Sequence, residues 1–398
     1  MNSNHDFDRS ATAGPPSAAS TPDFPMLDVR ETMKQDLPEF VQPALTWLTG
    51  KPYAGQKPFH RNAFSHILSA LAALGVGISL SWLGLPLGGS TLLLEPASWV
   101  LSTNGVRKLR LTIMHFCAHN TVLTSRAANF ALGEAISILT LSLNFRQYQR
   151  QHIRIHHGPK LLQPVDETHE FVVNSGGFKP GMSVPALWQH LWKTLFSPVF
   201  HLRYFGQRLR GCFLADDPKH NALALAVWVG ILTLVALTHS WLAFGLAYGV
   251  PVTVLFQMSS LLQNLVEHRW PVPPQLGQKP RRERGELTVA VFLGEATPQL
   301  PADAMRLQKA LAWTLWTLRM LFYHLPARVL VMMGDIVCHD FHHRRPGSKD
   351  WPNYSFARQA DLEAGSPGWP EPYQETWGLL EAIDATFKSL SQQPPLEK

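Results

Sequence analysis

Cysteine is scarce in this chain, and charged residues are absent from long stretches of it. The cysteines are Cys117, Cys212 and Cys338. Three thiols cannot build a disulfide framework, and we interpret them as small packing residues. No Lys, Arg, Asp or Glu lies between Lys219 and Glu267, and Glu95 is the only charged residue from 62 to 106. A membrane-spanning helix needs about 20 mainly apolar residues, so each stretch can hold two spans. The alternative is the buried helices of a soluble α/β protein.

The apolar runs predict an all-α integral membrane protein with about four transmembrane helices in two hairpins, at 64–104 and 221–262. The second hairpin should break around residues 238–241 and kink at 249–251. Two further stretches, 187–213 and 304–336, mix aromatic, apolar and basic residues, which favours helices in the membrane interface. We expect the helical stretch 304–336 to break at Pro326, because proline removes a backbone donor and clashes with the preceding turn.

Three segments are expected along the chain. Residues 1–58 form a disordered leader, with no signal peptide, and an amphipathic segment that leads into the membrane. Residues 59–345 form the membrane domain, with a loop over 158–185, and residues 346–398 form a polar cytosolic tail. The net charge is +6, but no nucleic-acid-binding motif is present and the basic residues flank the expected spans.

Basic residues beside membrane spans mark the cytoplasmic side. The clusters are Arg107, Lys108 and Arg110; Arg146, Arg150 and Arg154; Arg269 and Lys279–Arg284; and Arg344 and Arg345. They predict a multi-pass protein (of the inner membrane, in a bacterium) whose nearby polar elements all face the cytoplasm. Contacts with anionic lipids explain many of the same residues.

Histidine is concentrated in four short elements. They are His115-Phe-Cys-Ala-His119, His152-Ile-Arg-Ile-His156-His157, Asn264-Leu-Val-Glu-His268 and His339-Asp-Phe-His342-His343. On a helix, residues three and four apart share a face, so each element aims its imidazoles at one point. Nine imidazoles exceed what one zinc ion needs and suit two metal ions. The alternative, a buried core histidine, is our interpretation of His66, His239 and His324.

The order and spacing of these elements resemble the membrane fatty acid desaturase superfamily, from about residue 60 to 345. The resemblance implies a histidine-rich di-iron cap on the cytoplasmic side: two Fe ions bound by the nine histidines of the four elements, with O2 as co-substrate. Asn264 would contact one iron directly or through water. Carboxylates often orient metal-bound imidazoles from the second ring nitrogen. The candidates by proximity are Asp166, Glu267, Asp335 and Asp340.

The resemblance implies O2-dependent oxidation of an unactivated C–H bond of a lipid-like substrate entering a hydrophobic tunnel between the spans. Fatty acyl desaturation is the leading interpretation. Fatty acyl hydroxylation or alkane-type monooxygenation is the alternative, because the Asn264–His268 element also resembles alkane monooxygenases; carotenoid or sterol chemistry is a further possibility. A separate electron donor of the ferredoxin, rubredoxin or cytochrome b5 type, with its reductase, is expected. A membrane metal-binding or transport protein is the alternative from another class, but transport sites lie near the bilayer midplane.

Overall fold

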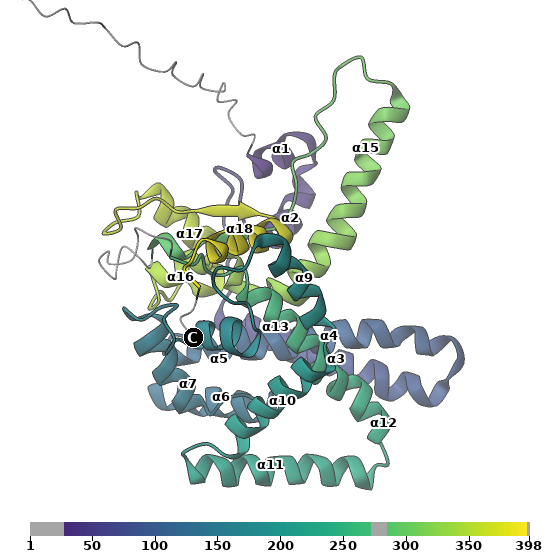
Figure 1. Cartoon of the computed structure of the whole chain (residues 1–398). Helices are drawn as coiled ribbons and strands as arrows, with labels where there is room; N and C mark the ends of the chain where they lie inside the picture. Colours follow the sequence, from purple (N-terminus) through teal and green to yellow (C-terminus); the bar gives the residue numbers. More distant parts are fainter. Residues whose placement is uncertain (1–27, 272–284, 396–398) are drawn as a thin grey trace, which may run out of the picture.

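The computed structural model describes residues 28–271 and 285–395, and this part of the chain is mostly helical (Figure 1). The expected leader at 1–25 and the basic run Lys279–Arg284 lie outside the described residues. The α-helices are α1 (Val29–Asp36), α2 (Gln42–Thr49), α3 (Ala63–Leu87), α4 (Glu95–Lys108), α5 (Met114–Ala118), α6 (Arg126–Leu139), α7 (Phe145–Gln151), α8 (Glu167–His169), α9 (Val184–Leu195), α10 (Pro198–Phe213), α11 (Pro218–Leu237), α12 (Trp241–Phe244), α13 (Phe256–Asn264), α15 (Arg306–Arg319), α16 (His339–Arg344), α17 (Tyr354–Glu363) and α18 (Leu379–Ser391).

Among the described residues, three helices are long and apolar enough to cross a membrane: α3, α11 and the continuous helix Trp241–Asn264. The bent pair Arg306–Val331 and Gly334–Arg344 would be a fourth if the two parts form one span. Their outward surfaces are apolar, since Leu83 of α3 is 66% exposed and Leu237 of α11 is 74% exposed. Contiguous exposed apolar surface of this kind marks an interaction site or a membrane. In Figure 1, the α3–α4 pair, α11 and α12 extend to the same side of the body. The chain therefore has the composition and shape of a membrane protein.

Helices α3 and α4 form the expected first hairpin, and small residues allow their backbones to approach closely. A Cβ on Gly105 would lie 2.6 Å from the backbone nitrogen of Leu74, and a Cβ on Gly77 would lie 2.4 Å from Ser102 Oγ. Small residues serve the same purpose in other membrane helix pairs. However, α4 is not among the three candidate spans. The expected four spans and their orientation stay predictions.

The second expected hairpin has its break where the sequence places it, and the kink expected at 249–251 stays a prediction. Helix α11 ends at Leu237 and α12 begins at Trp241. Two π turns, Gly245–Gly249 and Pro251–Leu255, then carry the chain into α13. Pro251 begins the second of these turns, so the helix continues through the proline.

The expected break at Pro326 is wrong. A single helix runs from Arg306 to Val331 and bends by 106° only before the segment Gly334–Arg344. Pro326 has helical dihedral angles and lies between the π turns Met320–His324 and Ala327–Val331. Hydrogen bonds in π turns skip one residue further than those of an α-helix, which makes room for the missing donor and the ring of proline.

The exclusively helical fold needs one correction, because the described residues include two short parallel strands. Strand β1 (Ala290–Phe292) pairs with β2 (Glu375–Trp377), with Ala290 opposite Glu375. All three residues of β1 are buried. Helix α18 follows β2 and buries Ile383 and Phe387 in the same hydrophobic core. The segment expected as a polar tail therefore contributes to the core beside the histidine elements.

Candidate metal centre

Two of the histidine elements lie on helices that contain a π turn. Helix α4 continues through the π turn Leu109–Ile113 into α5, which carries His115, and His119 caps the C-terminal end of α5. Helix α7 likewise runs into the π turn His152–His156. A π turn changes the direction of the side chains that follow it, and such turns are frequent at functional sites.

The other two elements come from the end of α13 and from α16. His268 follows the last turn of α13, and its backbone pairs with Thr288. Helix α16 begins at His339 and carries all three histidines of its element within six residues. Four distant parts of the chain thus supply the imidazoles.

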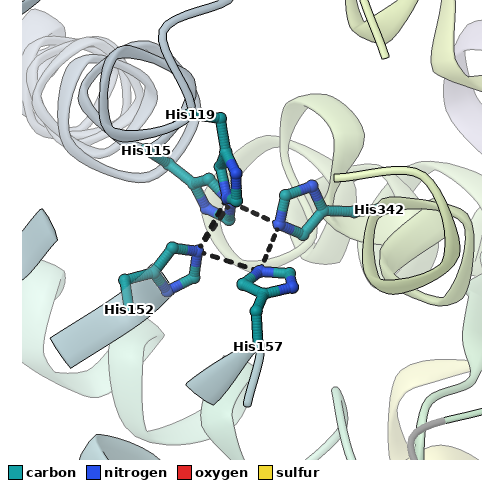
Figure 2. Close-up of side chains that lie close together, drawn as sticks. All are labelled: His115, His119, His152, His157 and His342. Atoms are coloured by element: carbon teal, nitrogen blue, oxygen red, sulfur yellow. Dashed lines mark hydrogen bonds between the residues drawn. The ribbon is translucent and has the colours of Figure 1, made fainter. Parts of the chain in front are cut away.

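The structure gathers five imidazoles into a first group, which consists of His115, His119, His152, His157 and His342. Figure 2 shows that their rings point toward one another from three parts of the chain. The Nε2 atoms of His115 and His342 are 2.7 Å apart, and those of His342 and His157 are 2.9 Å apart. His152 Nε2 lies 3.1 Å from the same atom of His119 and of His157.

The remaining four histidines form a second group: His156, His268, His339 and His343. The Nε2 atoms of His343 and His339 are 3.0 Å apart, and His268 Nε2 lies 3.3 Å from His339 Nε2. All four side chains are buried. The nine histidines of the sequence elements are therefore all brought together, five in one group and four in the other.

The donor set fits metal ions. Two imidazole nitrogens that bind one ion at about 2.1 Å, at right angles, lie about 3.0 Å apart, which matches the Nε2 separations in both groups. Burial lowers the pKa of His152, His342 and His343 well below its usual range, and neighbouring rings lower it further. Neutral imidazole is the form that binds metals. Without an ion, several buried lone pairs would face one another at a cost of a few kcal/mol each.

Carboxylates contact the second nitrogen of three rings. Asp166 Oδ2 lies 3.2 Å from His156 Nδ1, and Glu267 Oε1 lies 3.9 Å from His339 Nδ1. Burial alone would lower the pKa of His156, but Asp166 outweighs that effect and raises it to about 9. Both carboxylates are candidates by their proximity in the sequence. Asp166 lies beside a ring of the element that precedes it, whereas Glu267 lies near His339 and not beside its sequence neighbour His268.

One orienting carboxylate was missed and one candidate is placed elsewhere. Glu167 Oε1 lies 3.1 Å from His152 Nδ1. The contact of Glu167 with His152 is not predicted from the sequence, because residues 158–185 are expected to form a loop. In the structure, α8 begins within this stretch at Glu167. Asp340 contacts no imidazole nitrogen among the described residues; it accepts hydrogen bonds from Arg358 at 2.8 and 3.0 Å.

Residues expected to lie outside the metal groups do so. His66 Nε2 is 2.9 Å from the carbonyl oxygen of Pro352, and His324 Nδ1 accepts a hydrogen bond from the backbone of Gly294. Asn264 donates to the carbonyl of Ser260, and its role as a ligand stays a prediction. The interpretation of His239 as a buried core residue is wrong: it is exposed at the break after α11, with a positive φ of 50°.

The sequence model of the fatty acid desaturase family matches residues 95–367, more than half of the chain and all four histidine elements. The chain belongs to the fatty acid desaturase family. No curated protein matches it. The desaturase-family match extends beyond α16 into α17, so the residues after the last histidine element share in the family's sequence pattern. The family match and the two imidazole groups point to the same residues.

A polar cavity of about 510 Å³ adjoins both groups of imidazoles in this desaturase-family chain. His115 and His152 of the first group and His156 and His339 of the second line it. Much of the remaining wall is polar: Arg110, Ser142, Tyr148, Gln151, Asp166, Glu167, Thr168, Glu170, Ser175, Tyr204, Gln207, Arg208, Ser260, Gln263, Asn264, Glu267 and Asp335.

A second cavity, of about 440 Å³, lies among α3, α4, α11 and α12 and is almost wholly apolar. None of the nine histidines lines it. The cavity that touches the imidazoles has apolar as well as polar walls, the apolar ones including Leu111, Val165 and Phe171. The expected hydrophobic tunnel to the metal site stays a prediction. Arg208 stands between the two cavities: it lines the first and donates to the carbonyl of Thr140, which lines the second.

Proposed function

We propose that this protein oxidises an unactivated C–H bond of a lipid-like substrate with O2, using two iron ions held by the nine histidines. Fatty acyl desaturation is the leading reaction. The observation that supports this most is the convergence of five and four imidazoles, all but His119 buried, into two adjacent groups, in a chain of the fatty acid desaturase family.

Iron fits the donor set better than zinc does. A structural zinc ion takes four ligands, and calcium or magnesium prefers oxygen donors. Imidazole suits iron, and iron supplies the redox chemistry that zinc lacks. When bound, two irons would activate O2. In the proposal, Asp166 and Glu167 accept the Nδ1–H of His156 and His152 and so fix which ring nitrogen faces the metal. Glu267, 3.9 Å from His339 Nδ1, is beyond hydrogen-bond distance.

The electron balance requires a partner protein. Reduction of O2 to two waters takes four electrons and four protons. Formation of one double bond supplies two electrons and two protons from the substrate. In hydroxylation one oxygen atom enters the product and the other becomes water, and the substrate again supplies two of the four electrons. The other two electrons come from a separate donor of the ferredoxin, rubredoxin or cytochrome b5 type, with its reductase. Protons can arrive through the polar cavity that adjoins both groups.

Hydroxylation is the second candidate reaction, because the Asn264-x-x-Glu-His268 element also resembles alkane monooxygenases. Transport is not favoured: all nine histidines lie outside the three candidate spans, whereas transport sites lie near the bilayer midplane. In our proposal the protein crosses the membrane several times, with both imidazole groups on the cytoplasmic side.

Lipid and hydrocarbon profiling of a host that expresses the chain tests the reaction. A desaturase removes two hydrogen atoms from a product chain, and a hydroxylase adds one oxygen, so mass spectrometry separates them. His157→Ala should abolish the new product, while His239→Asn, outside both groups and compatible with a positive φ, should retain it. A product that persists in His157→Ala would contradict the proposed site.

A further inference from the structure

Arg110 is a charged side chain of this cavity that forms no ion pair with a carboxylate among the described residues, although its charge opposes the rise that burial causes in the pKa of Glu167. It precedes His115 on the same helical segment and lines the cavity together with both imidazole groups. Its guanidinium carbon lies 4.2 Å from the centre of the Tyr148 ring. The ring of Tyr148 in turn stacks on His152, with centroids 5.3 Å apart. The Tyr148 ring thus lies between Arg110 and His152 of the first imidazole group.

The other charged groups of the cavity, except Asp335, already contact protein groups. Asp166 and Glu167 contact imidazole nitrogens, and Glu267 accepts a hydrogen bond from Gln263. Glu170 accepts one from Asn174. Arg208 donates to three backbone carbonyls, those of Thr140, Leu141 and Val252. Asp335 also borders a smaller cavity, which is described below. Arg110 therefore remains as the cation available to a ligand.

We propose that Arg110 binds a carboxylate of the substrate, so that the protein acts on an anionic amphiphile rather than on an uncharged hydrocarbon. This inference rests on the proposed oxidation of a lipid-like substrate at the same site. A guanidinium carries five N–H donors, so beside the Tyr148 ring it can still present two parallel hydrogen bonds to a carboxylate or phosphate. A cavity of about 510 Å³ has the size of a small-ligand site. The anion and the oxidised carbon would then share one cavity.

Equilibrium binding to the purified full chain in detergent tests this, with dodecanoate, dodecanol and dodecyl phosphate as probes. Dodecanoate should bind at least tenfold more tightly than dodecanol. Arg110→Gln should remove this preference and Arg110→Lys should restore part of it, because lysine keeps the charge but not the paired donors. Arg203→Gln, an exposed arginine on α10, is the matched control and should change nothing.

Equal binding of dodecanoate and dodecanol, or an unchanged preference in Arg110→Gln, would overturn the proposal. Tighter binding of dodecyl phosphate that nanodiscs of phosphatidylglycerol compete away would also overturn it, and would assign Arg110 to a lipid headgroup. Binding is measured without turnover. A protein that prefers dodecanoate through Arg110 but holds no iron would refute the proposed oxidation and leave this inference standing.

A second feature is independent of Arg110. A cavity of about 10 Å³ lies beside His342 and Asp335. His342 Nδ1 and Asp335 Oδ1 are both buried and have no hydrogen-bond partner among the described residues. A space of roughly 10–15 Å³ holds one water molecule, provided that polar groups face it. A ring that binds metal through Nε2 carries its proton on Nδ1, so His342 needs an acceptor here.

We infer that one buried water joins His342 Nδ1–H to Asp335, which makes Asp335 a positioning residue for a ligand of the first group. Chelator competition on the intact protein tests this. Asp335→Ala should weaken metal binding about tenfold, and Asp335→Asn, which keeps an acceptor oxygen, should stay near the original affinity. Equal loss in both variants, matched by an equal fall in the melting temperature of the metal-free protein, would show a merely structural role and overturn the inference.

Discussion

His156 and His157 are neighbours in the chain, yet His157 belongs to the group of five imidazoles and His156 to the group of four. Their ring centroids are 5.6 Å apart and the rings are nearly perpendicular. His342 and His343 divide in the same way. Successive residues on a helix point in different directions, so a pair of adjacent histidines can serve two ions. This explains why two of the elements end in a histidine pair.

The orienting carboxylates should set metal affinity. Asp166→Asn and Glu167→Gln keep the shape of each side chain but weaken the acceptor for the Nδ1–H of His156 and His152. We expect each to lower metal affinity about 10- to 100-fold, measured by chelator competition. Glu363→Gln is a matched control, since this exposed carboxylate lies on α17. An equal loss of affinity in Glu363→Gln would show that the effect is not specific to the imidazoles.

Arg358 and Asp340, which lies within the element His339–His343, form a buried ion pair with 2.8 Å between Arg358 Nη2 and Asp340 Oδ2. Arg358→Ala would leave a buried carboxylate without its partner and should destabilise the fold by about 3–5 kcal/mol. A thermal melt of the metal-free protein measures this. Arg345→Ala, which removes a more exposed pair with Asp361, should cost about 1 kcal/mol or less. A reversed order would contradict the burial of the Arg358 pair.

The three cysteines should be unreactive in the folded protein. Burial raises the pKa of Cys117 to about 12 and that of Cys212 to about 12, and it raises the pKa of Cys338 as well. The thiolate is the reactive form, so at pH 8 almost no thiolate is present. Maleimide labelling at pH 8 should modify no cysteine in the native protein and three after unfolding. Rapid native labelling of Cys117 would place it in an open or electropositive setting.

The topology prediction concerns the sides of the membrane. Reporter fusions after Arg61, Lys219 and Lys398 should lie in the cytoplasm, because basic clusters mark that side. Fusions near Leu87 and Ser240, at the far ends of the apolar helices, should lie outside. A fusion after Lys219 that reads outside, with the fusion after Arg61 in the cytoplasm, would require an odd number of crossings between them and would contradict the two-hairpin topology.

Local sequence patterns predicted the histidine groups because spacing along a helix determines which side chains share a face. They also located Asp166, which lies close in sequence to the ring of His156 that it contacts. Glu267 is a neighbour of His268 in the sequence, but it lies near the ring of His339. The partner of Asp340 could not be predicted, since Arg358 reaches it from another helix. The pairing of β1 with β2 joins residues that are far apart in the chain. The contact of Glu167 with His152 could not be predicted, because the helical turn that carries Glu167 has no apolar periodicity.

The lining of the cavity beside the imidazoles could not be predicted from the sequence either. From the sequence, Arg110 is one of several basic residues beside an expected span. The structure shows that it contacts Tyr148 and lines the cavity. The helix through Pro326 depends on flanking π turns, which sequence patterns do not reveal. The sequence therefore did not predict the features that depend on contacts between segments far apart in the chain.

The count of iron per chain, in protein purified from iron-replete cells, tests the central claim most directly. We expect about two irons per chain, and fewer in both His157→Ala and His343→Ala, which remove a ligand from the first and the second group respectively. His239→Asn should keep two. One zinc and no iron in the original protein, or an unchanged iron content in both ligand variants, would contradict the two-iron site.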